Sequence, residues 1–213
     1  MTVAKNLTDF FTISERLESE QRLTRLSDGN QQTVASHSWN MIMMAIALRP
    51  YLKTPVNMET VLELCALHDL PESIAHDIPL HQQTPDVKAK KHIDEQRAIN
   101  EIDTLLQDKR VMTRFDEYEL RQSSESKLVK LLDILDTCVQ HMCTQELSYV
   151  GQYNDNFYWR AFFADSFAKQ FDYEPILRSV FDEIRERVAA RLKQELNIDY
   201  RVFINGETNS ENI

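Results

Sequence analysis

The stretch 65-CALHDLPESIAHDIPL-80 contains the dipeptide His-Asp twice, with a Pro-Glu between the two copies. His68 shares a helical face with Leu64, so its side chain is expected to point inward at the end of a buried helix. Asp69 follows at the carboxyl end of that helix, where the macrodipole disfavours a negative charge. Pro71 favours the first turn of a new helix. The stretch therefore predicts two consecutive helices that bury a polar pair at their junction.

The composition predicts an all-α fold. The chain has 213 residues, a length typical of one domain with one core, and only three of them are glycine. So few glycines disfavour both a sheet protein, whose turns need them, and a glycine-rich phosphate-binding loop. We expect a single-domain helical bundle over residues 1–204 and a disordered tail over residues 205–213.

The spacing of apolar residues predicts where the helices lie. Ser36 and Asn57 are expected to act as N-caps of two of them. The expected helices cover residues 6–26, 36–48, 58–70, 71–77, 90–108, 116–122, 125–147 and 174–196. The aromatic-rich segment 148–173 fits either a capping helix or a surface for self-association.

Charge and cysteine content narrow the class of function. The formal net charge of −10 disfavours binding to a nucleic acid polymer. No run of about 20 apolar residues could span a membrane. Residues 1–20 contain four acidic side chains and no apolar run, so no signal peptide is expected. The three cysteines are an odd number, which favours reduced thiols in the cytoplasm.

Two further polar residues lie where helical periodicity expects apolar side chains. His37 shares a face with Met41 and Met44, a pattern that fits a core histidine as well as a metal ligand. Asp133 lies among leucines in 128-LVKLLDILD-136, and a buried carboxylate must pair, take up a proton or bind a metal. Lys130 is a possible pairing partner. Asp136, one turn further on, is expected to be exposed if Asp133 is buried.

Together, His37, His68, Asp69 and Asp133 form a mixed set of nitrogen and oxygen donors. Two imidazoles and two carboxylates from separate helices suit a divalent transition metal such as Mn, Co, Fe or Zn better than Ca. A competing zinc site would use Cys138, His141 and Cys143, but it offers only three ligands with unfavourable spacing.

The order His37, His68-Asp69, Asp133 resembles the H…HD…D pattern of the HD-domain metal-dependent phosphohydrolases. The segments 34-VASHSW-39, 67-LHDLPESIAHDIP-79 and 128-LVKLLD-133 are similar to bacterial 5′-deoxynucleotidases and to phage deoxynucleoside triphosphate hydrolases, including those that act on dATP. The resemblance covers roughly residues 15–145. It implies that the four pattern residues are ligands of one or more divalent ions, with Co, Mn, Fe, Zn and Mg as candidates.

The resemblance also implies roles for residues around the metal. Glu72 matches the family's catalytic glutamate, which acts on the attacking water, and Asp77 matches an aspartate that positions the water or the leaving group. From the residues alone, Glu72 also fits a helix first turn and Asp77 also fits a helix end.

Four cations are candidates for binding the substrate phosphate: Arg22, Arg25, Lys88 and Lys130. Arg22 lies at the distance before His37 at which the family has an arginine. The nucleotidases have a tryptophan after that arginine, whereas Leu23 follows it here. Lys88 matches a family TP-x-K segment with one extra residue. Each lysine also fits an ordinary solvated position.

The expected function is metal-dependent hydrolysis of the 5′-phosphate ester of a deoxynucleotide. Lys88, Lys90 and Lys91 could contact a longer phosphate chain, which keeps a dNTP triphosphohydrolase as the alternative. A non-catalytic helical binding module and an HD enzyme that cleaves a cyclic or signalling nucleotide also remain open. The expected partners are a nucleotide and further copies of the chain, but no nucleic acid polymer and no membrane.

Overall fold

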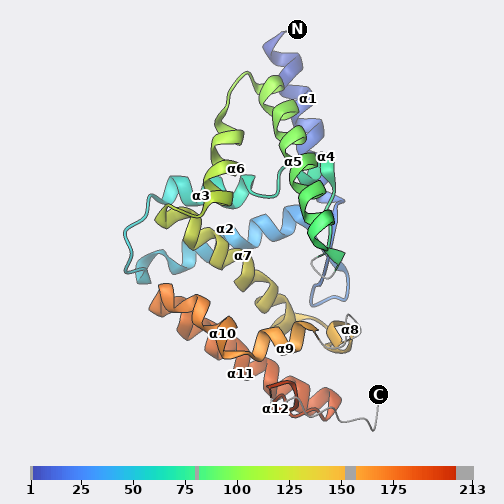
Figure 1. Cartoon of the computed structure of the whole chain (residues 1–213), viewed down its shortest axis with the longest axis vertical. Coiled ribbons are helices and arrows are strands. Elements are labelled where there is room, and N and C mark those ends of the chain that lie inside the picture. Colours follow the sequence, from blue (N-terminus) through green and yellow to red (C-terminus); the bar gives the residue numbers. More distant parts are fainter. Residues whose placement is uncertain (1, 80–81, 152–156, 205–213) are drawn as a thin grey trace. The chain divides into compact units, whose positions relative to one another are not determined.

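The computed structural model describes residues 2–79, 82–151 and 157–204, and almost all of its regular structure is helical (Figure 1). The prediction of an all-α fold is confirmed, with one small addition, a two-stranded sheet in which β1 pairs with β2. The elements in chain order are α1 (Val3–Glu15), η1 (Arg16–Glu18), β1 (Gln21–Arg25), β2 (Gln31–Thr33), α2 (Val34–Leu48), η2 (Arg49–Tyr51), α3 (Met58–Leu67), α4 (Glu72–Ala75), α5 (Pro85–Leu106), α6 (Arg110–Leu120), α7 (Ser124–Cys143), α8 (Ser148–Gly151), α9 (Phe157–Phe163), α10 (Asp165–Ala168), η4 (Lys169–Tyr173), α11 (Pro175–Leu196) and α12 (Arg201–Ile204).

The chain forms two compact units. Unit 1 comprises Met1–Leu23, Gln31–Pro50 and Thr54–Asp133, and unit 2 comprises Thr24–Asn30, Tyr51–Lys53 and Ile134–Ile213. The boundary falls inside α7, which continues from one unit into the other. The single domain over residues 1–204 stays a prediction, and the predicted disordered tail lies outside the described residues.

Two predictions about the amino-terminal region are wrong. The first helix does not run to residue 26, because it ends at Glu15 and residues 21–25 form β1. The turn between the strands uses Gly29 at φ 85°, where an added Cβ would lie 2.6 Å from Oε1 of Gln145. Helix α2 is capped by Thr33, and Ser36 instead occupies the third helical position of a capping box.

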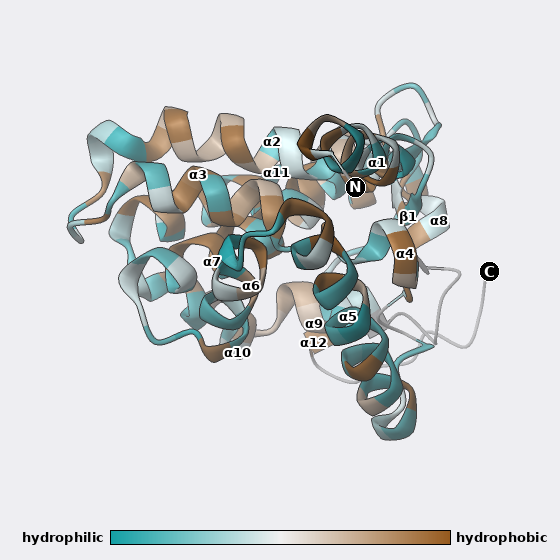
Figure 2. Ribbon diagram, turned by 90° about the horizontal axis from the view of Figure 1, so that it is seen from above, coloured by the Kyte–Doolittle hydropathy of each residue, from teal (hydrophilic) through white to brown (hydrophobic). Residues whose placement is uncertain are grey.

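Unit 1 packs α1, α2, α4, α5 and α6 around a common apolar core. Its fully buried members include Val34, Ile99 and Ile102, which come from α2 and α5. Helix α5 lies beside α1 and α4 (Figure 1) and is coloured largely hydrophilic in Figure 2, with hydrophobic turns between. The apolar side chains of α5 therefore pack into the core, and its polar side chains can contact α4, as Lys91 does with Glu72.

The aromatic-rich segment supplies the core of unit 2. Trp159, Phe163 and Phe171 are 0–1% exposed, and Phe171 stacks on Phe181 of α11 with ring centroids 4.6 Å apart. For these residues the aromatic content serves the interior rather than a surface for self-association. Within the described parts of the chain, no helix combines the length and the apolar character that a membrane crossing requires.

A buried histidine lies inside this aromatic core. His141 on α7 is 5% exposed, and its ring lies 5.4 Å from that of Trp159 and 5.9 Å from that of Phe162. Its Nδ1 has no hydrogen-bond partner among the described residues. Burial therefore lowers the pKa of His141 from 6.5 to about 4, so the native protein holds this ring neutral at neutral pH.

This burial predicts a pH dependence of stability. Above pH 6.5 the ring is neutral in both states, but between pH 6.5 and about 4 the unfolded chain takes up the proton first, so stability falls as the pH falls. In urea unfolding, His141→Phe should reduce the loss of unfolding free energy between about pH 7 and about pH 4.5 by roughly 2–3 kcal/mol. His92→Phe, at an exposed histidine of α5, is the control and should leave that loss unchanged. An unchanged loss in His141→Phe would contradict the assignment.

Candidate functional site

Unit 1 brings together the two histidines and two aspartates of the HD pattern. His37 lies in the first turns of α2 and is fully buried, and His68 is the C-cap of α3 and 4% exposed. Asp69 follows at the end of α3, and Asp133 comes from α7. Three separate elements therefore deliver four donor groups to one place.

Donor atoms of His37, His68 and Asp69 lie close enough to share one ion, and Asp133 lies beside His37. Nε2 of His37 is 3.7 Å from Oδ2 of Asp69 and 3.3 Å from Oδ1 of Asp133. Nε2 of His68 is 3.3 Å from Oδ2 of Asp69. One donor atom from each of His37, His68 and Asp69 lies within 4.8 Å of the others, and Asp133 joins this set through His37.

The tautomer of His68 follows from its partner. Nδ1 lies 3.1 Å from the carbonyl oxygen of Cys65, which can only accept, so Nδ1 carries the proton. Nε2 then presents a lone pair toward the cluster, is buried, and has no hydrogen-bond partner among the described residues. Burial also lowers the pKa of His68, which keeps the ring neutral. A histidine held by a backbone carbonyl through one nitrogen is typical of metal ligands.

Asp133 is held by two neighbours besides His37. Its Oδ2 accepts hydrogen bonds from Nζ of Lys130 at 2.7 Å and from Oη of Tyr118 at 2.8 Å. Burial favours a raised pKa for Asp133, but the charges of Lys130 and the hydrogen bond from His37 outweigh it and hold the pKa well below its usual range. The expected pairing of Lys130 with Asp133 is thus present. The expectation that Asp136 is exposed is wrong, because this residue is buried and accepts a bond from Gln140.

Arg22 reaches the same cluster from β1. Its Nη1 donates to Oδ2 of Asp69 at 3.0 Å, and its Nη2 lies 3.9 Å from Oδ1 of Asp133. Burial favours a lower pKa for Arg22, but the two carboxylates raise it above its usual value. For Asp69, burial favours a higher pKa, while His68 and Arg22 together lower it. Arg22 is therefore a fixed cation beside the candidate ligands.

Glu72 lies in the first turn of α4 and is 2% exposed. Its Oε1 accepts a hydrogen bond from Nζ of Lys91 at 2.9 Å, whereas its Oε2 is buried and has no hydrogen-bond partner among the described residues. Burial, and then the charge of Asp69, raise the pKa of Glu72 well above its usual value, and Lys91 opposes this shift. A carboxylate with one bonded and one open oxygen suits a general base.

Asp77 follows a tight turn after α4. His76 closes that helix at φ 66° and ψ 152°, a conformation that residues other than glycine rarely adopt. Glu20 spans the turn, since its Oε2 lies 2.8 Å from Nδ1 of His76 and its Oε1 accepts the backbone N–H of Asp77 at 3.0 Å. Burial raises the pKa of the half-buried Asp77, and Arg22 and Lys91 oppose that shift.

The two remaining phosphate-binding candidates are Lys88 on α5 and Arg25 on β1. Lys88 is exposed on the first turn of α5. Arg25 belongs to unit 2, where its guanidinium lies over the ring of Tyr149 at 5.5 Å. The competing zinc set is not brought together within the described residues, since Cys138 is buried and Cys143 is exposed.

Three residues of the cluster were not expected at the site from the sequence: Glu20, Glu95 and Tyr118. Lys91 was expected only as a contact for a longer phosphate chain. Tyr118 shares the buried face of α6 with Val111 and Phe115, a signal that predicts burial but not its bond to Asp133. Lys91 lies 19 residues from its partner Glu72, and helical periodicity carries no information about such a pair.

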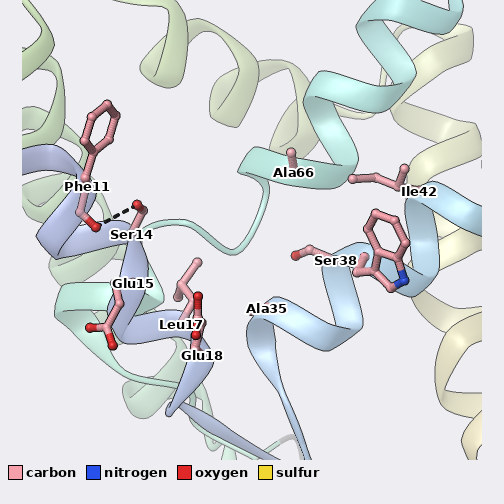
Figure 3. Close-up of a pocket in the computed structure, with 10 residues that line it drawn as sticks. Phe11, Ser14, Glu15, Leu17, Glu18, Ala35, Ser38, Ile42 and Ala66 are labelled. Atoms are coloured by element: carbon pink, nitrogen blue, oxygen red, sulfur yellow. Dashed lines mark hydrogen bonds between the residues drawn. The ribbon is translucent and has the colours of Figure 1, made fainter. Parts of the chain in front are cut away.

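Unit 1 also contains a pocket of about 410 Å³ outside this cluster (Figure 3). Its wall includes Phe11 of α1 and Ile42 of α2, with Glu15 and Glu18 among its polar residues. None of the candidate metal, catalytic or phosphate-binding residues lines it. Phe11 of α1 is 58% exposed.

The charges of the cluster fit a divalent cation. Its linked carboxylates are Glu20, Asp69, Glu72, Asp77, Glu95 and Asp133, whereas its cations are Arg22, Lys91 and Lys130. The excess of negative charge, the open Nε2 of His68 and the mixed donor set all match a bound divalent metal ion. The chemistry of the residues and the expected group therefore agree.

Comparison with known proteins places this chain in a family. A model of the HD domain matches residues 14–171. The chain is similar to 5′-deoxynucleotidase HDDC2 of Danio rerio, with 36% identity over 119 residues that cover 54% of this chain and 57% of that protein. It is also similar to 5′-deoxynucleotidase HDDC2 of Homo sapiens, with 28% identity over 159 residues that cover 73% of this chain and 72% of that protein. The alignment with the Danio rerio protein thus spans little more than half of that protein.

A solved structure supports the same fold. The chain is similar to a predicted metal-dependent phosphohydrolase from Magnetospirillum magnetotacticum MS-1, with a TM-score of 0.67 and 20% identity over 86% of this chain and 93% of that chain. At this identity the likeness concerns the fold. The HD-domain match contains all of the candidate site residues and more than half of the chain. As the resemblance implied, this chain belongs to the HD-domain family.

Proposed function

We propose that this protein is a divalent-metal-dependent phosphohydrolase of the 5′-deoxynucleotidase type, which cleaves the 5′-phosphate ester of deoxynucleotides. The observation that carries the proposal is the fixed tautomer of His68, whose open Nε2 faces His37 and the carboxylate of Asp69. The relatives named 5′-deoxynucleotidase support the substrate class.

His37, His68, Asp69 and Asp133 are the residues that would hold the ion. Their two imidazoles and two carboxylates suit Mn, Co, Fe or Zn, and Mg is the further candidate. A bound divalent ion would supply Lewis-acid chemistry, which offsets phosphate charge and lowers the pKa of water from about 16 toward ~7.

The protein residues around the ion would carry the proton transfers. Glu72 would accept a proton from the attacking water through its open Oε2, as the water oxygen bonds to phosphorus and the bond from phosphorus to the 5′-oxygen breaks. Asp77, whose pKa is raised, would position or deliver the proton that the 5′-oxygen takes. Arg22 would donate to phosphate oxygens from its place beside Asp69.

The alternative, a dNTP triphosphohydrolase that releases triphosphate, needs cations beyond the first phosphate. Of the three lysines considered for this role, Lys91 is engaged by Glu72 and Glu95, and Lys90 is 81% exposed beside Asp94. Lys88 is exposed, which leaves few fixed cations on α5 for a longer phosphate chain. This arrangement favours the monophosphate as substrate.

The proposal includes a cytoplasmic location and a homo-oligomer. For the oligomer, apolar side chains on the surface of unit 1 offer support: Trp39 of α2 is 63% exposed and lines the same pocket as Phe11. Sedimentation velocity at several concentrations measures the state directly.

The metal ligands can be tested by an isosteric substitution at Asp69 and a truncation at His68. Asp69→Asn and His68→Ala should lose bound Mn or Co after dialysis and should lower kcat/KM for dNMPs by at least ~1000-fold, because a Lewis acid supplies several kcal/mol of transition-state stabilisation. Metal content is measured by plasma mass spectrometry. His92→Ala, at an exposed histidine of α5, should retain both properties. Full metal content and activity in Asp69→Asn would refute the metal site.

The product distribution separates the monophosphatase from the triphosphatase. With a panel of dNMPs, dNTPs and ribonucleotides and added Mn, Co, Mg or Zn, we expect inorganic phosphate and deoxynucleoside from dNMPs, because few fixed cations lie beyond the candidate site. Phosphate release and chromatography of the nucleosides give the readout. Free triphosphate from a dNTP would establish the alternative instead.

A further inference from the structure

Lys91 is a partly buried cation for which the proposed reaction has no assigned role. Its side chain is 19% exposed, and its Nζ lies 2.9 Å from Oε1 of Glu72 and 3.4 Å from Oε1 of Glu95. Glu95 is one helical turn further along α5, and its side chain is 14% exposed. Lys91 therefore links a carboxylate of its own helix to a carboxylate on α4.

We infer that Lys91 is a positioning residue for Glu72: it holds Oε1 so that Oε2 remains open toward the reacting water. The inference rests on the proposed function. The side chain of Glu72 is only 3% exposed, so solvent gives Oε1 little alternative partner. Helices α4 and α5 pack side by side, which fixes the distance that the lysine spans.

The contacts of Lys91 distinguish it from a lysine that binds phosphate. Its ammonium group is engaged by two carboxylates at once, and removing it would leave Glu72 buried without its cation. Glu95 in turn restrains the lysine. The side chains of Glu95, Lys91 and Glu72 thus form two consecutive ion pairs that end at the proposed catalytic carboxylate. Lys88, on the same helix, is exposed and suits contact with a mobile ligand better.

A merely structural ion pair between α4 and α5 is the competing explanation. It would lower the stability of the fold without acting through the carboxylate of Glu72. A double-mutant cycle separates the two, because residues that act as one unit give effects that do not multiply.

The test compares the wild type with Lys91→Met, Glu72→Gln and the double variant on the dNMP that is hydrolysed fastest. Lys91→Met should lower kcat about 10- to 100-fold, with KM within about twofold and metal content unchanged. In the Glu72→Gln background the same substitution should change kcat by less than about twofold. Lys91→Arg should recover most of the loss, since it restores a cation that can donate to Oε1.

Two further variants keep the result decisive. Glu95→Gln loosens Lys91 without touching Glu72 and should lower kcat by about two- to fivefold at an unchanged melting temperature. Arg97→Met removes a 75% exposed cation of α5 that pairs with Asp94, and it should leave kcat unchanged. If Lys91→Met does not fold, Glu95→Gln and Lys91→Arg carry the test.

The outcomes distinguish this inference from the proposed function. If the wild type hydrolyses dNMPs and the effects of Lys91→Met and Glu72→Gln multiply, Lys91 is structural and the proposed function stands. Wild-type levels of kcat in Lys91→Met would also overturn the inference. If the metal-loaded wild type hydrolyses no nucleotide, the proposed function fails, and the inference fails with it.

Discussion

The site in unit 1 depends on the free-energy cost of placing several carboxylates close together in a partly buried cluster. Six linked carboxylates share three cations, and Asp69 and Asp133 face two imidazoles at distances of 3.3–3.7 Å. Arg22 and Lys130 offset part of this charge, but they do not bond the open nitrogen of His68. A bound divalent cation would satisfy the nitrogen lone pair and the carboxylates together, and would offset the cost of this arrangement.

Helix ends make the arrangement possible. The end of α3 places His68 and Asp69, the restart at Pro71 places Glu72, and the end of α4 at His76 turns the chain toward Asp77. Hydrogen bonds with backbone groups and neighbouring side chains then fix the orientation of these site residues, as the carbonyl of Cys65 does for the ring of His68. Short helices thus give the site several differently directed side chains within ten residues of sequence.

The part of the site that sequence could predict is the part that breaks helical periodicity. His37 and Asp133 are polar residues on apolar faces, and burial there requires a partner, so the candidate ligands were identifiable. The roles of Lys91 and Tyr118 were not, because their partners lie on other helices and periodicity reports only which face is buried. The first helix was extended too far because residues 21–25 contain one apolar residue, Leu23, and therefore lack the apolar and polar alternation of a strand. Whether the four HD-pattern residues bind an ion stays a prediction.

The most direct test of the metal site is anomalous X-ray diffraction from crystals grown with Mn or Co. The account predicts an anomalous peak at about 2.0–2.3 Å from Nε2 of His37 and Nε2 of His68, with oxygens of Asp69 and Asp133 in the same shell. No peak at saturating metal, or a peak at Cys138 and His141 in its place, would contradict it.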